Sequence, residues 1–222
     1  MSRSLLSCAL ALAATLSASA DPVLEMMRSV APDGPVYAYE LTFSGDGVTA
    51  SGKLDPSQPE GQRLDLYSPE EADFSDDFRE GLEDMDREAD GDIWCTDFVE
   101  MVPGNAAASM ETETSRTYTF TPQPEADADK TEKKMMKKLN ATVTLDKADG
   151  AILAFNMSLP KPYKPAMVAK INRFEMSATC DRAPDGRTYM KSFDFDIAGS
   201  AMMQSFEQTI SRRITRLLDP VS

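Results

Sequence analysis

Strict alternation of apolar and polar side chains constrains the fold of this chain more than any other feature of its sequence. Residues 36–43 and, much later, residues 189–197 both alternate with a period of two, which is the period of a β-strand with one buried face. Turn sequences at 45–47, 146–150 and 183–186 predict antiparallel hairpins. The inward-facing side chains would be Tyr37, Tyr39, Leu41 and Phe43 in the first run and Phe193, Phe195 and Ile197 in the second. We therefore expect a mainly β (α+β) fold, a curved antiparallel sheet or an incompletely closed half-barrel.

The rest of the chain also reads mostly as strands. The segment after Gly199 fits both helical spacing and strand alternation, and its many Ser and Thr residues favour a strand. The charged stretch 122–138 lacks apolar support and predicts a mobile loop, with a short helix at 133–138. Further strands are expected at residues 48–54, 63–67, 93–102, 116–121, 143–145, 152–159 and 167–180.

One acidic helix is expected after residue 68. Ser68 can cap it, Pro69 suits its first turn, and Glu71 occupies the position of a capping-box acid. An apolar stripe then runs along an otherwise acidic segment, which indicates a helix packed on the sheet by one face. The stripe consists of Phe74, Phe78, Leu82 and Met85.

The first twenty residues have the pattern of a secretory signal peptide. Arg3 precedes an apolar run over residues 5–16, and Ala18-Ser19-Ala20 places the cleavage site before Asp21. The run is too short to span a bilayer and no second one follows, so no transmembrane segment is expected. The sequence thus predicts a signal peptide at 1–20, a single exported domain at 21–222 and a periplasmic location.

Cleavage would leave two cysteines, Cys95 and Cys180, because Cys8 lies within the predicted signal peptide. Two cysteines in an oxidising compartment most often form one disulfide, and two buried free thiols are the alternative. The residues around Cys8 resemble a lipoprotein box only faintly, since the apolar run continues well past that position.

Charge and histidine content narrow the classes of function. The chain carries a net charge of −14 and no histidine, which removes the usual general base and the commonest transition-metal ligand. Residues 21–129 hold 27 acidic against 6 basic side chains, whereas residues 130–222 hold 10 against 16. The dominant negative field argues against nucleic-acid binding. The split predicts either two solvated faces that attract each other or a basic patch that meets an anionic lipid or partner.

Residues 86–97 partly match the loop of an EF-hand. Such a loop needs oxygen ligands at positions 1, 3, 5 and 12, with glycine at 6 and an aliphatic residue at 8. Long Glu88 and short Asp97 depart from the usual ligands, and Trp94 is foreign to such a loop. We therefore expect an acidic helix that turns into a strand, with no metal site and no cofactor. If calcium did bind, its carboxylate ligands would be Asp86, Asp90 and Asp97.

The order of elements resembles the periplasmic lipoprotein-carrier (LolA-like) architecture, from the signal peptide through an early helix to long late hairpins. The turn at 147–150, followed by Ile152 and by a final hairpin around Gly199, is also similar to exported proteins of Gram-negative bacteria whose role is not known. The resemblance implies an open sheet with helices on its concave side, where an acyl chain binds.

We expect a non-catalytic protein that binds or carries an apolar or lipidic ligand. Thirteen methionines remain after cleavage, and methionine suits both adaptable apolar sites and ordinary cores. The alternatives are an interaction module of the cell envelope with a protein partner, with or without bound calcium, and a carboxylate-based hydrolase. The candidate groove residues are Tyr39, Phe43, Phe74, Phe78, Leu82, Phe193 and Phe195.

Overall fold

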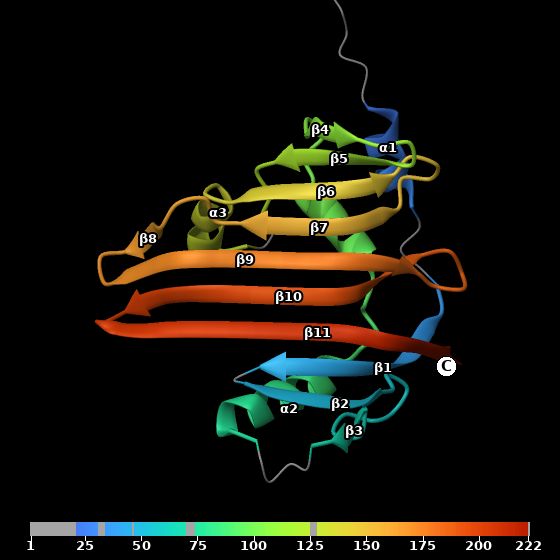
Figure 1. The fold of residues 1–222 in the computed structure, drawn as a ribbon, viewed down its shortest axis with the longest axis vertical. Helices are drawn as coiled ribbons and strands as arrows, with labels where there is room; N and C mark the ends of the chain where they lie inside the picture. The colour runs from blue at the N-terminus through green and yellow to red at the C-terminus, as the bar shows by residue number, and fades with distance from the viewer. Residues whose placement is uncertain (1–20, 31–33, 46, 70–73, 125–127, 222) are drawn as a thin grey trace, which may run out of the picture.

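The computed structural model describes residues 21–30, 34–45, 47–69, 74–124 and 128–221, so the predicted signal peptide lies outside the described residues. The chain forms one antiparallel sheet of 11 strands in the order β3-β2-β1-β11-β10-β9-β7-β6-β5-β4, with β8 paired to β9 (Figure 1). The edge strands β3 and β4 do not pair with each other, so the sheet is open. The predicted mainly β class and antiparallel sheet are confirmed.

Within the described residues, three α-helices and one 3-10 helix accompany the strands. The helices are α1 (Pro22–Ser29), α2 (Asp76–Glu88) and α3 (Lys130–Met136), and the 3-10 helix is η2 (Cys95–Met101). The strands of the first half are β1 (Val36–Gly45), β2 (Val48–Leu54), β3 (Leu64–Ser68), β4 (Ala107–Glu111) and β5 (Ser115–Phe120). Those of the second half are β6 (Asn140–Asp146), β7 (Ile152–Ser158), β8 (Tyr163–Ala166), β9 (Ala169–Arg182), β10 (Thr188–Ala201) and β11 (Gln204–Val221).

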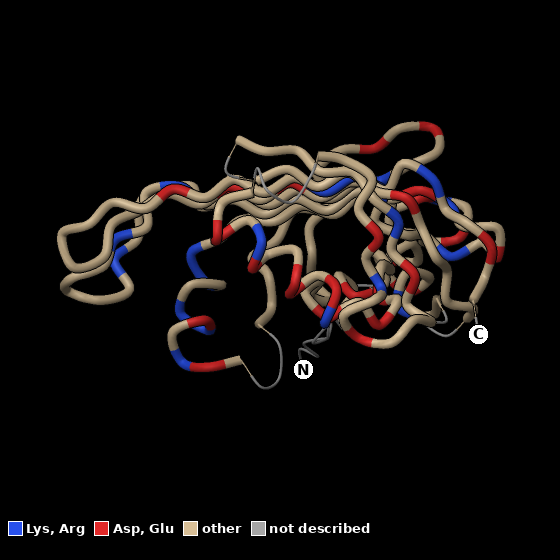
Figure 2. Tube along the Cα trace, turned by 90° about the horizontal axis from the view of Figure 1, so that it is seen from below, with Lys and Arg blue, Asp and Glu red and all other residues tan. Residues whose placement is uncertain are grey.

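Three apolar clusters pack the inner face of the sheet, the face on which the sequence pattern places the large side chains. The first joins α1 and η2 to β5, β6, β7 and β9, around the fully buried Tyr118, Val143 and Phe155. The second surrounds Tyr37, Tyr39 and Trp94, and the third joins α2 to β1, β2 and β3. Seen along the sheet, the chain outside the strands lies mainly on this side (Figure 2). Where these three clusters lie, the inner face of the sheet is therefore packed core.

The acidic helix forms, but it begins later than its sequence signals predicted. Ser68 ends β3, and the helix cap is Ser75, whose hydroxyl accepts a hydrogen bond from the Phe78 amide at 3.1 Å. Glu71 of the expected capping box lies outside the described residues. Ser75 has the same capping chemistry as Ser68 and is followed by two acids, Asp76 and Asp77, which suit a helix N-terminus.

The strand predicted over residues 93–102 is wrong. Only Trp94 makes a β-bridge, to Tyr189, and the chain then turns into η2. Cys95 and Phe98 are both buried, and a spacing of three aligns side chains on one face of a 3-10 helix. The disulfide holds this helix to the sheet, because Cys95 bonds Cys180 with an S–S distance of 2.00 Å and a Cα–Cα distance of 6.4 Å. The predicted disulfide is confirmed.

Several elements were absent from the sequence prediction. α1 begins directly after Asp21, whose carboxylate accepts from the Val23 amide, the Tyr118 hydroxyl and the Arg116 guanidinium. The edge strand β4 and the short β8, which contains Pro165, were also missed. Within the charged stretch 122–138, the short helix expected at 133–138 does form as α3, but it begins three residues earlier, and residues 125–127 lie outside the described part.

The segment after Gly199 is a strand, as its Ser and Thr content indicated. β9, β10 and β11 are 14, 14 and 18 residues long, whereas β6 and β7 have only 7 residues each. The β7 pairing ends at Glu175 of β9, and the β1 pairing ends at Ile210 of β11. Residues 163–174 and 196–209 therefore project beyond the neighbouring strands as a narrow extension, which we call the arm (Figures 1 and 2).

Candidate functional site

An open groove of about 740 Å³ lies between α2 and the edge strand β3. We call it the α2–β3 groove. Its volume falls within the range of roughly 300–1,000 Å³ that is usual for small-ligand sites. Its apolar lining comprises Leu64, Leu66, Tyr67, Pro69, Phe74 and Leu82, and its polar lining comprises Glu60, Gly61, Asp65, Arg79, Glu83, Asp86 and Arg87.

The groove exists because β3 is short and lies at the edge of the sheet. Alternation along β3 turns Leu64 and Leu66 toward the third apolar cluster, where they pack against it while remaining partly exposed. Tyr67 is 55% exposed and extends the apolar surface outward. Among the described residues, no further strand pairs with the free edge of β3, so no strand covers this side of the groove.

Asp86 fixes the two walls of the groove to each other. Its carboxylate, only 8% exposed, accepts hydrogen bonds from the backbone amides of Leu64 at 2.7 Å and of Gly61. Arg63 completes the junction by donating to the Arg87 carbonyl at 2.8 Å. These bonds hold the start of β3 to the end of α2, so Asp86 acts in the fold.

The structure brings four of the seven candidate groove residues together. Phe78 lies 5.3 Å from Phe43 and 5.0 Å from Phe74 between ring centroids, and Leu82 belongs to the same cluster. Of these four, only Phe74 and Leu82 line the α2–β3 groove. Phe43 and Phe78 instead belong to the packed interface between helix and sheet.

The other three candidates lie elsewhere. Tyr39 is 3% exposed in the second cluster, and burial raises the pKa of its hydroxyl. Phe193 packs against the first cluster. Phe195 contacts Phe174 edge-to-face at 5.6 Å, near the base of the arm. These three therefore do not share a site with the α2–β3 groove.

The groove residues missed by sequence reasoning are Leu64, Leu66 and Tyr67. The sequence predicts a strand at this position but contains no signal that it lies at the edge of the sheet, which decides whether its apolar side chains are covered. Strand order arises from pairings distant in sequence, and local alternation does not report them. The sequence offered one indication of an edge position, which is that the predicted strand is short and is followed by a helix.

Acidic side chains dominate the rim of the groove. Glu60, Asp65 and Glu83 accompany the buried Asp86, against Arg79 and Arg87. Arg79 pairs with Asp76 at 3.2 Å. Arg87 pairs with Asp84, and this hydrogen bond raises the pKa of the guanidinium. The local field therefore disfavours a strongly anionic ligand.

The carboxylates of the EF-hand-like stretch 86–97 do not converge on one point. Asp86 faces β3, and Asp90 accepts a hydrogen bond from the Asp92 amide at 2.9 Å. Burial, together with the neighbouring Asp92 carboxylate, raises the pKa of Asp97 to about 7. Among the described residues, no group of three or more acidic or cysteine side chains is arranged to hold a metal ion.

The described helices include none that is both long enough and apolar enough to cross a lipid bilayer. Comparisons with protein families, with curated proteins and with solved structures gave no match to this chain. The resemblance to the lipoprotein-carrier architecture therefore stays a prediction.

Proposed function

We propose that this protein binds an apolar or lipidic ligand without catalysis, and that it does so in the periplasm after export. The observation that carries the proposal is the α2–β3 groove, where Leu66 and Tyr67 present apolar surface to solvent and the buried Phe74 adds to the lining. Among the described residues, no strand pairs with the outer edge of β3 beside this groove. Sites for small ligands are concave and mostly apolar, with a few polar groups that orient the ligand. The groove combines six apolar lining residues with several charged ones, so it offers both apolar surface and groups that could orient a ligand.

The rim charges restrict the head group of the ligand. Glu60, Asp65 and Glu83 repel a carboxylate or phosphate, while an uncharged or cationic group meets no such repulsion. The best-fitting ligand is therefore an acyl chain with an uncharged, zwitterionic or cationic head. The acyl chain lies on the leucines of β3 and on the apolar stripe of α2, and the head group of the ligand lies at the acidic rim.

Two independent features support export. The sequence has the pattern of a signal peptide before Asp21, and Cys95 and Cys180 form the disulfide that an oxidising compartment permits. N-terminal sequencing of protein recovered from the periplasm should find Asp21 as the first residue. Retention of Met1, or lipid attached at Cys8, would contradict this part of the proposal.

The ligand proposal is tested with fluorescent acyl probes of two kinds, one with an uncharged head and one a fatty acid. The wild type should bind the uncharged probe more tightly. Tyr67→Asp, at the mouth of the groove, should weaken binding at least tenfold. The matched control is Met110→Asp, because Met110 is similarly exposed (63% against 55%) on the opposite edge strand β4 and lies far from the groove.

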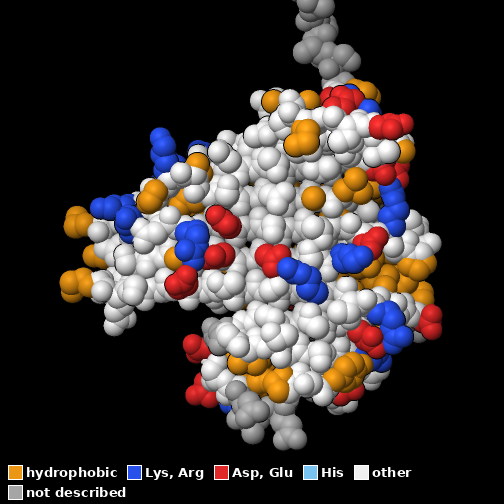
Figure 3. Space-filling model, viewed as in Figure 1, with side chains coloured by type: hydrophobic (Ala, Val, Ile, Leu, Met, Phe, Trp, Pro, Cys, Tyr) orange, Lys and Arg blue, Asp and Glu red, His pale blue; other side chains and the backbone are white. Residues whose placement is uncertain are grey.

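Phe78 would be a poor test position, because it is 3% exposed within the packed interface and its replacement by a charge would disturb the fold. If the folded wild type binds neither probe, the proposal fails. The second candidate, an interaction module of the envelope, is then favoured by the broad polar outer face of the sheet (Figure 3). On that face the Arg213 guanidinium holds both oxygens of Asp194 at 2.7 Å.

A further inference from the structure

The end of the arm exposes large apolar side chains on two adjacent hairpin turns. Met167 and Val168 connect β8 to β9 and are 99% and 58% exposed, and Met202 and Met203 connect β10 to β11 and are 77% and 102% exposed. The Met202 amide donates a hydrogen bond to the Val168 carbonyl at 2.9 Å, so the two turns form one surface. We call these four residues the apolar tip, which is visible at one side of Figure 3.

The turn between β10 and β11 is unusual for its residue types. Ala201 pairs with Gln204, so Met202 and Met203 form a two-residue loop, and both have positive φ, at 50° and 69°. Such loops favour Gly, which has no β-carbon to be strained in this region, and Asn, whose short polar side chain can hydrogen-bond locally. The chain uses glycine for this purpose at Gly150 and Gly186, with φ of 75° and 91°. Neither turn geometry nor packing explains two methionines here.

The surroundings of the apolar tip are basic, although the whole chain is acidic. Lys161, Lys164 and Lys170 flank the two turns, and no acidic residue occurs in residues 160–174 or 197–206. None of these three lysines takes part in an ion pair within the part of the chain that the structure describes. The lysine-rich helix α3 contacts β8 and lies on the same side of the molecule (Figure 2). The arm therefore ends in apolar side chains and carries positively charged lysines next to them.

We propose that the apolar tip inserts into the interfacial region of an anionic lipid bilayer, with Lys161, Lys164 and Lys170 contacting the lipid phosphates. The arm projects beyond neighbouring strands, so the tip can reach a flat surface before the acidic parts of the molecule do. Methionine adapts its shape to an irregular apolar environment, and lysine extends its ammonium group from an apolar stem toward the head groups.

A protein partner fits the same surface less well. A stable protein interface buries about 800 Å² on each side, which four side chains at the end of a narrow arm do not supply. A bilayer needs only that the tip enters it while each nearby lysine adds about a fivefold gain in affinity for an anionic surface. The expected binding is reversible and weakens at high salt, because the lysine contribution is screened.

The test uses the full mature chain in flotation with two kinds of vesicle, phosphatidylcholine alone and phosphatidylcholine with phosphatidylglycerol. The wild type should float with the second kind at low salt and much less with the first. The triple variant Lys161→Gln, Lys164→Gln, Lys170→Gln should lose about hundredfold in affinity, or about fivefold for each lysine. Lys53→Gln on β2, far from the tip, is the matched control.

The apolar part is tested by Met167→Ser with Met203→Ser, which should reduce vesicle binding at least tenfold. Met110→Ser, an exposed methionine on β4, should leave it unchanged. All these positions are exposed or only partly buried, and unchanged melting temperatures will show that the variants fold. Equal binding to both kinds of vesicle, or full binding by the methionine variant, would overturn the proposal. So would a wild type that binds no vesicles but self-associates through these methionines.

This proposal and the proposed ligand function fail separately. Tyr67→Asp should keep vesicle binding while losing the soluble acyl probe, because Tyr67 lies at the groove of β3 and not on the arm. Conversely, the Met167→Ser, Met203→Ser variant should keep the acyl probe. Loss of both activities in one variant would show that the two surfaces are not independent.

Discussion

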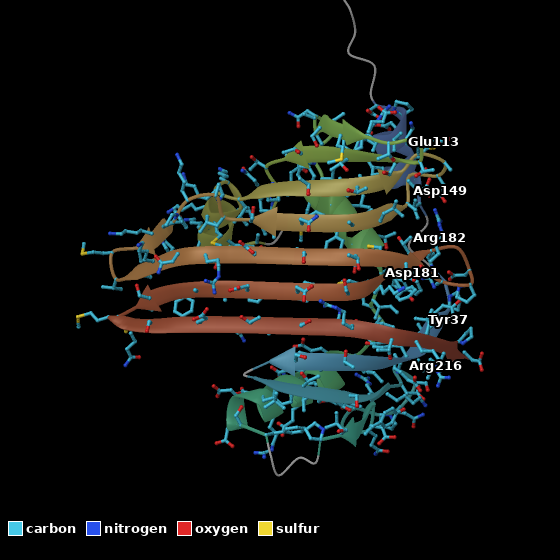
Figure 4. All side chains as sticks on the ribbon, in the orientation of Figure 1. Tyr37, Glu113, Asp149, Asp181, Arg182 and Arg216 are labelled. Atoms are coloured by element: carbon cyan, nitrogen blue, oxygen red, sulfur yellow. A yellow bond between two sulfur atoms is a disulfide. The ribbon has the colours of Figure 1, made fainter. Side chains whose placement is uncertain are left out.

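The two ends of the long strands β9, β10 and β11 follow the same alternating pattern but carry opposite kinds of turn. At one end the turns are polar and tied by ion pairs. There Arg182 lies 2.9 Å from Asp149 and Lys191 lies 2.6 Å from Asp181 (Figure 4). At the other end the turns carry the four residues of the apolar tip, with no ion pair among the described side chains of either turn. Ordinary hairpin chemistry explains the first end, whereas the second needs a role outside the folded chain.

The arm and the rest of the molecule, which we call the body, also differ in how far other elements cover the inner face of the sheet. In the body, α1 and η2 close over β5, β6, β7 and β9, so that Phe155 is fully buried. In the arm, Phe174 and Ile197 are only partly buried and Phe206 is 40% exposed. The period of a strand predicts which side chains share a face, but it does not predict whether another element covers that face.

The largest expected effect compares one phenylalanine from each region. Phe155 stacks on Phe98 with ring centroids 4.5 Å apart and is fully buried, so Phe155→Ala should cost about 3–5 kcal/mol of unfolding free energy. Phe206→Ala in the arm should cost below about 1 kcal/mol, because that ring is already 40% exposed and belongs to none of the three apolar clusters. Urea denaturation measures both, and similar losses would show that the arm is part of the packed core.

Removal of the disulfide should have the next largest effect. The bond closes a loop across a sequence separation of 85 residues, and its loss typically costs about 2–4 kcal/mol. The variant Cys95→Ser with Cys180→Ser should lose hydrogen-exchange protection in η2 and in the adjacent part of β9. Protection in the arm should not change, and a uniform loss would contradict the separation of the two regions.

The sequence predicted features that depend on local alternation and missed features that depend on distant contacts. Alternation predicted β1, β10 and β11 and placed Tyr39 and Phe193 on the inner face, because that signal is local. It misassigned residues 93–102, where Ile93, Trp94 and Cys95 suit a strand by type but are held in place by the bridge to Tyr189 and by the disulfide. Those constraints come from residues far along the chain.

The α2–β3 groove was predicted only in part, for a related reason. Phe74 and Leu82 belong to the apolar stripe that the sequence displays directly, although Phe74 lies just before the helix cap Ser75. Leu64 and Leu66 line the groove because β3 pairs with a strand on one side only within the described ranges, and this depends on the order of strands. Helix α1 was missed because its anchor is Asp21, whose partners Arg116 and Tyr118 lie nearly a hundred residues away.

A smaller effect, opposite in sign, is expected at the apolar tip. Replacing Met202-Met203 by Asn-Gly should stabilise the protein by about 1–2 kcal/mol, because both positions have positive φ. The same variant should lose vesicle binding. Thermal unfolding and flotation measure the two effects, and a destabilised variant would show that the methionine side chains contribute to folding after all.

The smallest expected effect concerns Asp97, in the part of the molecule outside the arm. The pKa of Asp97 is raised to about 7 by burial and by Asp92, so the folded protein binds a proton there that the unfolded chain releases near pH 4. Stability should therefore fall as pH rises between about 4 and about 7, and stay lowered above that range. Asp97→Asn removes this dependence.

At about pH 8 the Asp97→Asn variant should be more stable than the wild type by at most about 1 kcal/mol, since solvent screens a partly exposed carboxylate. That difference corresponds to a rise of about 2–4 °C in melting temperature, and it should vanish near pH 4. Glu113→Gln, in the exposed β4–β5 turn, is the control and should keep the pH dependence of the wild type, because Asp97 is intact in it. A variant that is less stable than the wild type at pH 8, with a wild type that calcium stabilises, would instead make Asp97 a cation ligand.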